Sequence, residues 1–381
     1  MSRAFIRRSR KMELSTKVAA ETVKIMGRTI CRDGILFLGQ AGSFIEFEME
    51  GTRTELVLDV CAASVEPSRR SWIAVYRDYP RTLLCRFAPQ PGCRRYAVFA
   101  ASSRQKAVLR VVKLSESGYG SIGIHAIVTD TGIVRPTAYR RRRIEFIGDS
   151  ITCGYGVGQK NGEPFCTGGE DCLAAYAALA AERLGADYQI VAQSGIGVYS
   201  SYTEAGAAEP NRAELMPVLY EHTDLSTEKL RGFSPIKWDF RRFRPQLIVV
   251  NLGTNDASYV GGLAVRRQAF AAAYSAFLER VLRASPDAFV LCTLGLMDGS
   301  LCETEENVVR SLRKKGGRIA FYAQEAMRGD EGKGADGHPG RAAQNRAAGE
   351  LVRQVDKWNP WEPDRYAGPE SPAAPHNGCS V

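Results

Sequence analysis

The hydrophobic pattern of the chain changes near residue 140, and this change constrains the fold more than any other feature of the sequence. Beyond that point, short apolar segments alternate with longer segments in which apolar residues recur every three or four positions. Short apolar runs are typical of buried strands, and the longer period is typical of amphipathic helices. Their regular alternation predicts a parallel sheet covered by helices on both faces. The expected strands are residues 144–147, 188–192, 247–252, 288–293 and 318–322, and the expected helices are 171–184, 265–282, 304–316 and 341–357.

The first third of the chain has no convincing helical period. Between residues 28 and 135, segments rich in β-branched and aromatic residues are separated mostly by Gly, Pro, Asn, Asp or Ser. This spacing predicts an all-β sandwich or jelly roll. The expected strands are residues 43–49, 55–60, 72–76, 95–100 and 108–114.

These two patterns divide the chain into four parts. We expect a basic tail over residues 1–24, a β-sandwich over 25–136, an α/β domain over 137–358 and a second tail over 359–381, with both tails disordered. The four arginines at 140–143 join the two domains and are too few to act as a flexible tether. The sandwich should therefore pack directly on the α/β domain.

The net charge of +9 does not by itself indicate nucleic-acid binding. Five positive charges lie within residues 1–11 and four within 140–143, and no basic stripe with interleaved aromatic residues is present. Met12 is an alternative start that would remove most of the basic tail. No apolar stretch approaches the ~20 residues of a membrane span, and no apolar segment of a secretory signal follows the basic N-terminus. We expect a cytoplasmic protein without a nucleic-acid or membrane partner, and its oligomeric state stays open.

The ten cysteines do not indicate a disulfide framework or a zinc site. They are scattered, and Cys166 and Cys172 are the one close pair, with no second pair to complete a metal site. Reduced, mostly buried thiols are expected in a chain without an export signal.

Polar and glycine-rich segments follow the expected strands of the second domain. Ser150 follows the first strand, QSGIG follows the second, GTND follows the third, and DGHP with His338 lies just before the last helix. In open α/β sheets, functional groups gather beyond the carboxyl ends of the strands. Ser150 alone could equally be a helix cap. Together, the four segments supply the nucleophile, base and oxyanion donors that acyl transfer requires.

The blocks GDSI, GIG, GTND and DGHP occur in the order and at the spacing of SGNH (GDSL-type) hydrolases. Over about residues 25–357 the chain resembles carbohydrate esterase family 2. The resemblance implies an SGNH-type, flavodoxin-like three-layer domain after an N-terminal jelly roll. It also implies removal of acetyl groups from xylan or glucomannan, often at the primary 6-O position, without a metal or organic cofactor. The runs that carry it are IEFIGDSITCGYGV, EDCLAAYAALAAERLGADYQIVAQSGIGVY and WDFRRFRPQLIVVNLGTNDAS.

The resemblance also assigns roles to single residues. Ser150 corresponds to the nucleophile and His338 to the general base. The main-chain N–H groups of Ser150 and Gly197 and the side-chain amide of Asn255 correspond to the oxyanion hole. Asp256 is expected to organise its loop rather than to take part in catalysis.

The third member of a catalytic triad is where the sequence departs from the wider SGNH pattern. That pattern has an acid three residues before the histidine, and here this position is Ala335. Asp336 stands one residue nearer, and Gly337 would permit a tight turn that restores its reach. Some members of the esterase family orient the histidine with a main-chain carbonyl instead. Asp336 as a third catalytic residue and a Ser–His dyad therefore both stay open.

Aromatic residues near the strand ends are candidates for a sugar platform. Trp238 precedes the third strand, and Tyr155 and Tyr199 lie in loops after the first two. An aromatic residue beside a sheet belongs to the core more often than to a sugar site, so both interpretations apply to Trp238.

The sequence thus predicts a serine esterase that removes O-acetyl groups from plant-type polysaccharides or oligosaccharides. One alternative is an SGNH lipase or thioesterase, which would need an apolar channel for its acyl chain. Another is a carbohydrate-binding protein with a vestigial site, against which the complete set of Ser150, Gly197, Asn255 and His338 argues.

Overall fold

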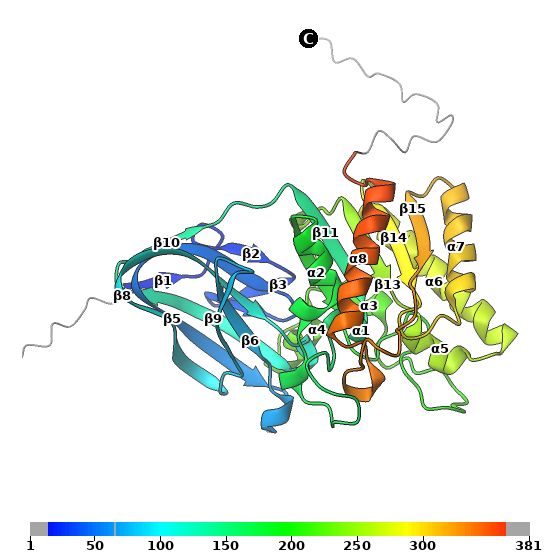
Figure 1. The fold of residues 1–381 in the computed structure, drawn as a ribbon, viewed down its shortest axis with the longest axis horizontal. Helices are drawn as coiled ribbons and strands as arrows, with labels where there is room; N and C mark the ends of the chain where they lie inside the picture. The colour runs from blue at the N-terminus through cyan, green and yellow to red at the C-terminus, as the bar shows by residue number, and fades with distance from the viewer. Residues whose placement is uncertain (1–13, 65, 363–381) are drawn as a thin grey trace, which may run out of the picture.

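The computed structural model describes residues 14–64 and 66–362, which form an N-terminal β-sandwich and a C-terminal α/β domain (Figure 1). All strand pairs of the sandwich are antiparallel, and its main strand order is β3-β4-β9-β5-β8-β6-β7. The predicted all-β region is confirmed. Its strands are β1 (Leu14–Lys17), β2 (Lys24–Met26), β3 (Thr29–Arg32), β4 (Ile35–Leu38), β5 (Phe44–Ala62), β6 (Ile73–Arg77), β7 (Thr82–Phe87), β8 (Gly92–Lys113), β9 (Gly120–Thr129) and β10 (Ile133–Pro136).

Two of these strands are much longer than the sequence suggests. The expected strands 43–49 and 55–60 are parts of β5, and 95–100 and 108–114 are parts of β8. The register between β5 and β8 shifts after Gly51, where the sequence reads as a turn. A β-bulge inserts an unpaired residue and bends the strand without ending it. The turn-like residues therefore mark a bend within a continuous strand.

The sandwich also begins earlier than residue 25. Strand β1 pairs with β9, and Val18 and Val23 are buried in the core. The predicted disordered tail is therefore wrong for residues 14–24, because their apolar side chains complete the sandwich. At the other end, Trp361 lies 5.0 Å from the Arg142 guanidinium, so 359–362 are also part of the packed structure. Residues 1–13 and 363–381 lie outside the described residues.

The α/β domain contains a five-stranded parallel sheet of order β12-β11-β13-β14-β15. This is the flavodoxin-like order, in which the first two strands of the domain exchange places. Helices α2 and α8 pack on one face of the sheet, and α6 and α7 pack on the other. The fold class predicted from the sequence is confirmed. The strands are β11 (Arg142–Gly148), β12 (Ala186–Ala192), β13 (Leu247–Asn251), β14 (Phe289–Leu294) and β15 (Ile319–Ala323); the helices are α1 (Ser150–Cys153), α2 (Tyr176–Arg183), α3 (Met216–Tyr220), α4 (Leu225–Arg231), α5 (Thr254–Val260), α6 (Ala264–Ala284), α7 (Cys302–Lys314) and α8 (Arg341–Trp358).

The sandwich packs directly on the α/β domain, as the short connection at 140–143 predicts. Lys24 of the sandwich donates to Asp187 of β12 at 2.6 Å, and both side chains are buried. Arg28, fully buried, contacts Glu145 of β11 at 3.1 Å. Apolar residues of both domains share one core cluster, to which the sandwich contributes Met26, Ala41, Phe44, Ala74, Val112 and Leu114.

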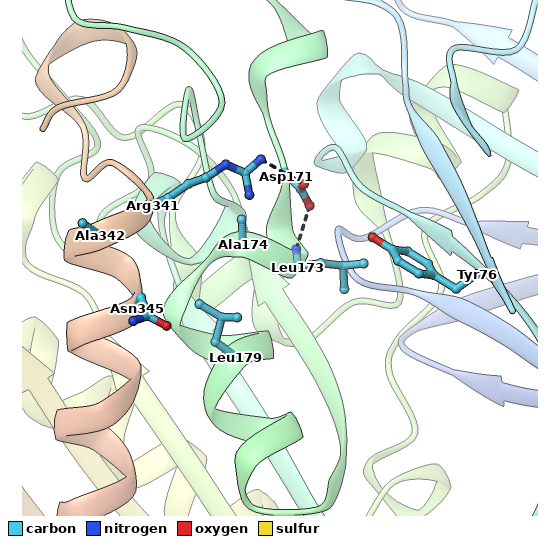
Figure 2. Close-up of a pocket in the computed structure, with 8 residues that line it drawn as sticks. All are labelled: Tyr76, Asp171, Leu173, Ala174, Leu179, Arg341, Ala342 and Asn345. Carbon is cyan, nitrogen blue, oxygen red and sulfur yellow. Dashed lines mark hydrogen bonds and ion pairs between the residues drawn. The ribbon is translucent and has the colours of Figure 1, made fainter. Parts of the chain in front are cut away.

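Figure 2 shows a pocket of about 430 Å³ at this junction. Tyr76 of β6 borders it from the sandwich, and Leu173 borders it from the short 3-10 turn Cys172–Ala174. Arg341, at the start of α8, lies 3.7 Å from Asp171 on its α/β side. The first turn of α8 is therefore tied to the segment before α2. Within 14–64 and 66–362, no helix combines the length and the apolar character that a membrane span requires.

Candidate active site

Ser150 lies where the central strand β11 turns into the short helix α1. The preceding Asp149 caps this helix, because its carboxylate accepts the Ile151 N–H at 3.0 Å. Ser150 is itself the first residue of the helix and is only 5% exposed. The G-D-S sequence thus fixes the serine at the carboxyl end of the sheet, where the topology places functional groups.

His338 approaches Ser150 from the segment just before α8. Its Nε2 lies 2.8 Å from Ser150 Oγ, and its Nδ1 lies 3.2 Å from the main-chain carbonyl of Ala335. A carbonyl can only accept, so Nδ1 must carry the proton and Nε2 is left as the acceptor for the serine hydroxyl. The structure therefore joins two residues 188 positions apart in the arrangement of a nucleophile and its base.

Asp336 does not orient His338 through its carboxylate. Its Oδ2 accepts the Tyr155 hydroxyl at 2.8 Å, and its side chain is exposed. Asp336 and Gly337 both have left-handed backbone conformations, with φ of 51° and 73°. This turn brings the Ala335 carbonyl against both the main-chain N–H and Nδ1 of His338, at 3.0 and 3.2 Å. Of the two alternatives, the structure has the main-chain carbonyl, and the assignment of Asp336 as the orienting carboxylate is wrong.

Burial lowers the pKa of His338 below its ordinary value of 6.5, because the charged imidazolium loses solvation. The hydrogen bond to Ala335 and the negative charge of Asp336 raise the pKa but do not reverse the shift. The imidazole is therefore neutral at neutral pH, as a general base must be before it takes a proton.

Asn255, the second residue of α5, links the strand-end loops to one another. Its Nδ2 donates to Asp149 Oδ2 at 3.2 Å and to the Ile196 carbonyl at 2.9 Å. Burial raises the pKa of Asp149 to about 7. The GTND block is thus bonded both to the segment that carries Ser150 and to the QSGIG segment.

Gly197 is held tightly, and its N–H already has an acceptor. The N–H donates to Ser201 Oγ at 3.2 Å. A Cβ at this position would lie 2.0 Å from the Ser200 carbonyl, so only glycine fits. By contrast, the Ser150 N–H has no acceptor among the residues of 14–64 and 66–362. Of the three expected oxyanion donors, the Asn255 amide and the Gly197 N–H both already have acceptors, and the Ser150 N–H has none in the described part of the chain.

Asp256 organises its neighbouring loop, as expected. Its buried carboxylate accepts the N–H groups of Val198, Tyr199 and Ser200 at 2.7 to 3.1 Å. Three donors on one carboxylate fix the loop that follows Gly197.

Trp238 is a structural residue and not a sugar platform. Its side chain is only 6% exposed, and its ring lies 4.9 Å from the guanidinium of Arg28 and 5.0 Å from that of Arg242. Arg28 is itself buried against Glu145 of β11. The prediction for Trp238 is wrong because this aromatic ring is used to cover a buried cation at the domain interface.

The aromatic residue beside the histidine is Tyr155. Its ring centroid lies 4.5 Å from that of His338 and 3.8 Å from that of Phe165, on which it stacks. The ring centroid of Tyr119 lies 5.8 Å from that of Phe165, and the Arg69 guanidinium lies 5.4 Å from the Phe165 ring centroid. Sequence reasoning named Tyr155 but missed the other three. Tyr119 and Arg69 belong to the sandwich, so no local signal places them near Ser150.

Among residues 14–64 and 66–362, no group of three or more His, Cys, Asp or Glu side chains is placed to hold a metal ion. A flavodoxin-like sheet with a serine–histidine pair and the four strand-end blocks at its carboxyl edge defines an SGNH-type hydrolase.

Comparison with known proteins agrees with this class. Residues 146–365 match the model of the GDSL-like lipase/acylhydrolase family, and the chain belongs to that family. It is a carboxylic ester hydrolase with the two-domain architecture of carbohydrate esterase family 2.

The relatives match to different extents. The chain is 27% identical over 345 residues to an acetylxylan esterase/glucomannan deacetylase of Cellvibrio japonicus, covering 89% of both proteins. It is 33% identical over 227 residues to the cellulase/esterase CelE of Acetivibrio thermocellus. This match covers 58% of this chain and 26% of CelE. The structure of a family two carbohydrate esterase from Clostridium thermocellum in complex with cellohexaose is 26% identical. It covers 89% of this chain and 100% of that chain, with a TM-score of 0.77.

Proposed function

We propose that this protein is a serine esterase that removes O-acetyl groups from polysaccharides or oligosaccharides of the xylan and glucomannan type. The observation that carries the proposal is the 2.8 Å contact between Ser150 Oγ and His338 Nε2 at the carboxyl edge of the sheet. The substrate class is supported by the similarity to a protein named acetylxylan esterase/glucomannan deacetylase.

The proposed reaction is a two-step acyl transfer. Ser150 Oγ attacks the acetyl carbonyl carbon while His338 Nε2 takes the hydroxyl proton. When the tetrahedral intermediate collapses, the bond to the sugar oxygen breaks and His338 gives its proton to that oxygen. Water then attacks the acetyl-serine ester with the same base, which releases acetate and restores the serine hydroxyl.

We assign the Ser150 N–H and the Asn255 amide as oxyanion donors, and the amide must exchange one of its bonds to Asp149 and Ile196 for the oxyanion. The amide is held next to the turn by its bond to Asp149, and the Ser150 N–H has no acceptor in the described part of the chain. We assign Gly197 as the third donor, which must exchange its bond to Ser201 for the oxyanion. Loss of one such donor raises the barrier by about 2.7–4 kcal/mol in well-studied cases.

A second candidate, an esterase for longer acyl chains, is favoured by one observation. A cavity of about 1020 Å³ borders Gln193 and Ile196, and it is largely lined by apolar side chains of the α3–α4 region. Neither Ser150 nor His338 lines this cavity. An acyl channel should open onto the nucleophile, so the acetyl-specific interpretation is the stronger one.

One experiment separates these functions. Acetylated glucomannan and xylan are incubated with the protein, and the loss of each acetyl signal is followed by NMR. A parallel series of p-nitrophenyl acetate, butyrate and octanoate measures chain-length preference. We expect acetyl release by the wild type and none by Ser150→Ala with unchanged fold. A rate that increases towards octanoate, with no release from the polysaccharides, would replace the acetylesterase by a lipase.

A further inference from the structure

One buried carboxylate near the site comes from the β-sandwich and not from the α/β domain. Glu116 lies between β8 and the 3-10 turn Ser117–Tyr119, and it is only 3% exposed. Its Oε2 accepts the main-chain N–H of Ser194 at 2.6 Å. Ser194 is the second residue after β12, in the QSGIG segment that ends at Gly197. A side chain of one domain therefore holds the main chain of a catalytic loop in the other.

The same carboxylate also faces the helix that carries the nucleophile. Cys153, the last residue of α1, has its Sγ 3.9 Å from Glu116 Oε2. Since α1 begins at Ser150, Glu116 lies between the nucleophile helix and the QSGIG segment. The distance from Ser150 to the oxyanion loop is therefore set partly by where this carboxylate sits.

The backbone around Glu116 is itself fixed. Its N–H donates to Glu170 Oε1 at 3.0 Å. The buried Lys113 ammonium donates to the carbonyls of Ser115 and Glu116, at 2.8 Å each. The carboxylate is thus presented from a rigid segment, which is what positioning a catalytic loop requires.

Burial of this carboxyl group carries a cost. Desolvation raises the pKa of Glu116 above its usual value of 4.5, and the hydrogen bond from Ser194 opposes this shift only in part. A buried carboxylate that only filled space would be replaced favourably by an apolar side chain of similar volume. A short bond to a main-chain N–H of the oxyanion loop gives the group a use that an apolar side chain lacks.

We propose that Glu116 is a positioning residue for ester hydrolysis, which holds Ser194 so that the QSGIG segment keeps its place beside Ser150. The β-sandwich is then a structural part of the catalytic site. This inference rests on the proposed function, because it concerns the same oxyanion loop.

The test compares three substitutions at Glu116. Glu116→Gln keeps an acceptor oxygen at the same reach, and Glu116→Asp keeps the charge but withdraws the acceptor by about one C–C bond, ~1.5 Å. Glu116→Ala removes both. The matched control is Glu55→Gln, because Glu55 is a buried carboxylate of the same sandwich that contacts only Arg53 and Arg95 among its described ion pairs. For each variant, kcat and KM for p-nitrophenyl acetate, affinity for a boronic acid that forms a tetrahedral adduct with serine, and Tm are measured.

We expect Glu116→Asp and Glu116→Ala to lower kcat by about 10- to 100-fold, somewhat less than the loss of a whole oxyanion donor. KM should change less than about threefold, because the loop is proposed to hold the oxyanion, which develops only on the way to the tetrahedral intermediate. Affinity for the boronic acid should fall by the same factor as kcat. Glu116→Gln and Glu55→Gln should both stay within about threefold of the wild type.

The outcomes distinguish this inference from the function on which it rests. A wild type that hydrolyses no acyl ester refutes the proposed function. An active wild type with a folded Glu116→Asp variant of unchanged kcat and boronate affinity overturns the role of Glu116 alone. If Glu116→Ala fails to fold, the contrast between the Gln and Asp variants still decides. A merely structural role would lower Tm in both without lowering boronate affinity.

Discussion

Replacing Asp336 by Asn should lower turnover by no more than about fivefold. The proton of His338 Nδ1 is held by the Ala335 carbonyl at 3.2 Å, and the Asp336 carboxylate accepts the Tyr155 hydroxyl at 2.8 Å. The substitution therefore removes a nearby charge but no hydrogen bond that sets the tautomer of the imidazole. An asparagine oxygen can still accept from Tyr155, so the loop should keep its conformation.

The size of the expected effect follows from exposure. Asp336 is exposed, and ion pairs between exposed groups contribute about 0–1 kcal/mol. A loss of about 1 kcal/mol from the stabilisation of the transient imidazolium corresponds to about a fivefold fall in kcat. In a triad whose buried aspartate holds the histidine, the Asp→Asn change costs about 10⁴-fold, or about 5.5 kcal/mol. The two interpretations therefore differ by more than three orders of magnitude.

The assay is hydrolysis of p-nitrophenyl acetate under saturating substrate, with the fold checked by circular dichroism. His338→Ala is the control that should abolish activity. Tyr155→Phe is the matched control that removes the hydroxyl held by Asp336 while keeping the ring over His338. A folded Asp336→Asn variant with kcat reduced 100-fold or more would refute the orientation of His338 by the main-chain carbonyl.

Three further predictions concern protonation, the nucleophile turn and the buried tryptophan. First, kcat/KM should rise with pH as His338 loses its proton, because only the neutral imidazole accepts a proton, and the pKa of this step should lie below 6.5 because His338 is buried. The pH profile is fitted with two ionisations, the lower for His338 and the upper, near 7, for Asp149. A lower ionisation at or above 6.5 would contradict the assignment to His338. Second, Asp149→Asn places an NH₂ group against either the Ile151 N–H or the Asn255 amide. The free energy of unfolding, measured with denaturant, should fall by about 1–3 kcal/mol, and kcat should fall with it. Unchanged stability would show that these hydrogen bonds are dispensable. Third, Trp238→Phe should lower the free energy of unfolding by about 1–2 kcal/mol without changing KM for acetylated glucomannan, whereas a raised KM at unchanged stability would restore Trp238 as a sugar platform.

The part of the site that could be predicted from the sequence is the part determined by strand order. In a parallel sheet, loops after adjacent strands lie at one edge, so Ser150 after β11 and Asn255 after β13 must be neighbours. His338 is adjacent to the start of α8, which packs on α2 and the same face of the sheet. Topology therefore brings these side chains together once the periodicity is recognised.

The orientation of His338 could not be predicted in the same way. Whether the Asp336 carboxylate or the Ala335 carbonyl reaches Nδ1 depends on the conformation of the turn at Asp336 and Gly337. Asp336 has a φ of 51°, a conformation that aspartate adopts occasionally and that no neighbouring residue requires. Gly337 permits a turn but does not decide which group the turn presents. The spacing of the acid from the histidine was therefore compatible with both arrangements.

The sequence also did not indicate which residues of the β-sandwich lie near the active site, because their position depends on contacts between the domains. Tyr119 and Arg69 contact Phe165, which stacks on the tyrosine beside His338. Each of these residues is typical of a loop or turn in its own segment. Their proximity depends on how the two sheets are docked on one another, and neither periodicity nor motif spacing carries that information.

The docking itself shows why the sandwich is not a detachable sugar-binding module. Lys24 and Arg28 of the sandwich form buried ion pairs with Asp187 and Glu145 of the α/β sheet. Breaking a buried ion pair by removing one partner costs about 3–5 kcal/mol, because the remaining charge is uncompensated. Two such losses are comparable to the whole stability of an ordinary domain, about 5–15 kcal/mol. The buried ion pairs therefore stabilise one arrangement of the two domains, and in that arrangement a side chain of the sandwich can hold the catalytic loop at Ser194.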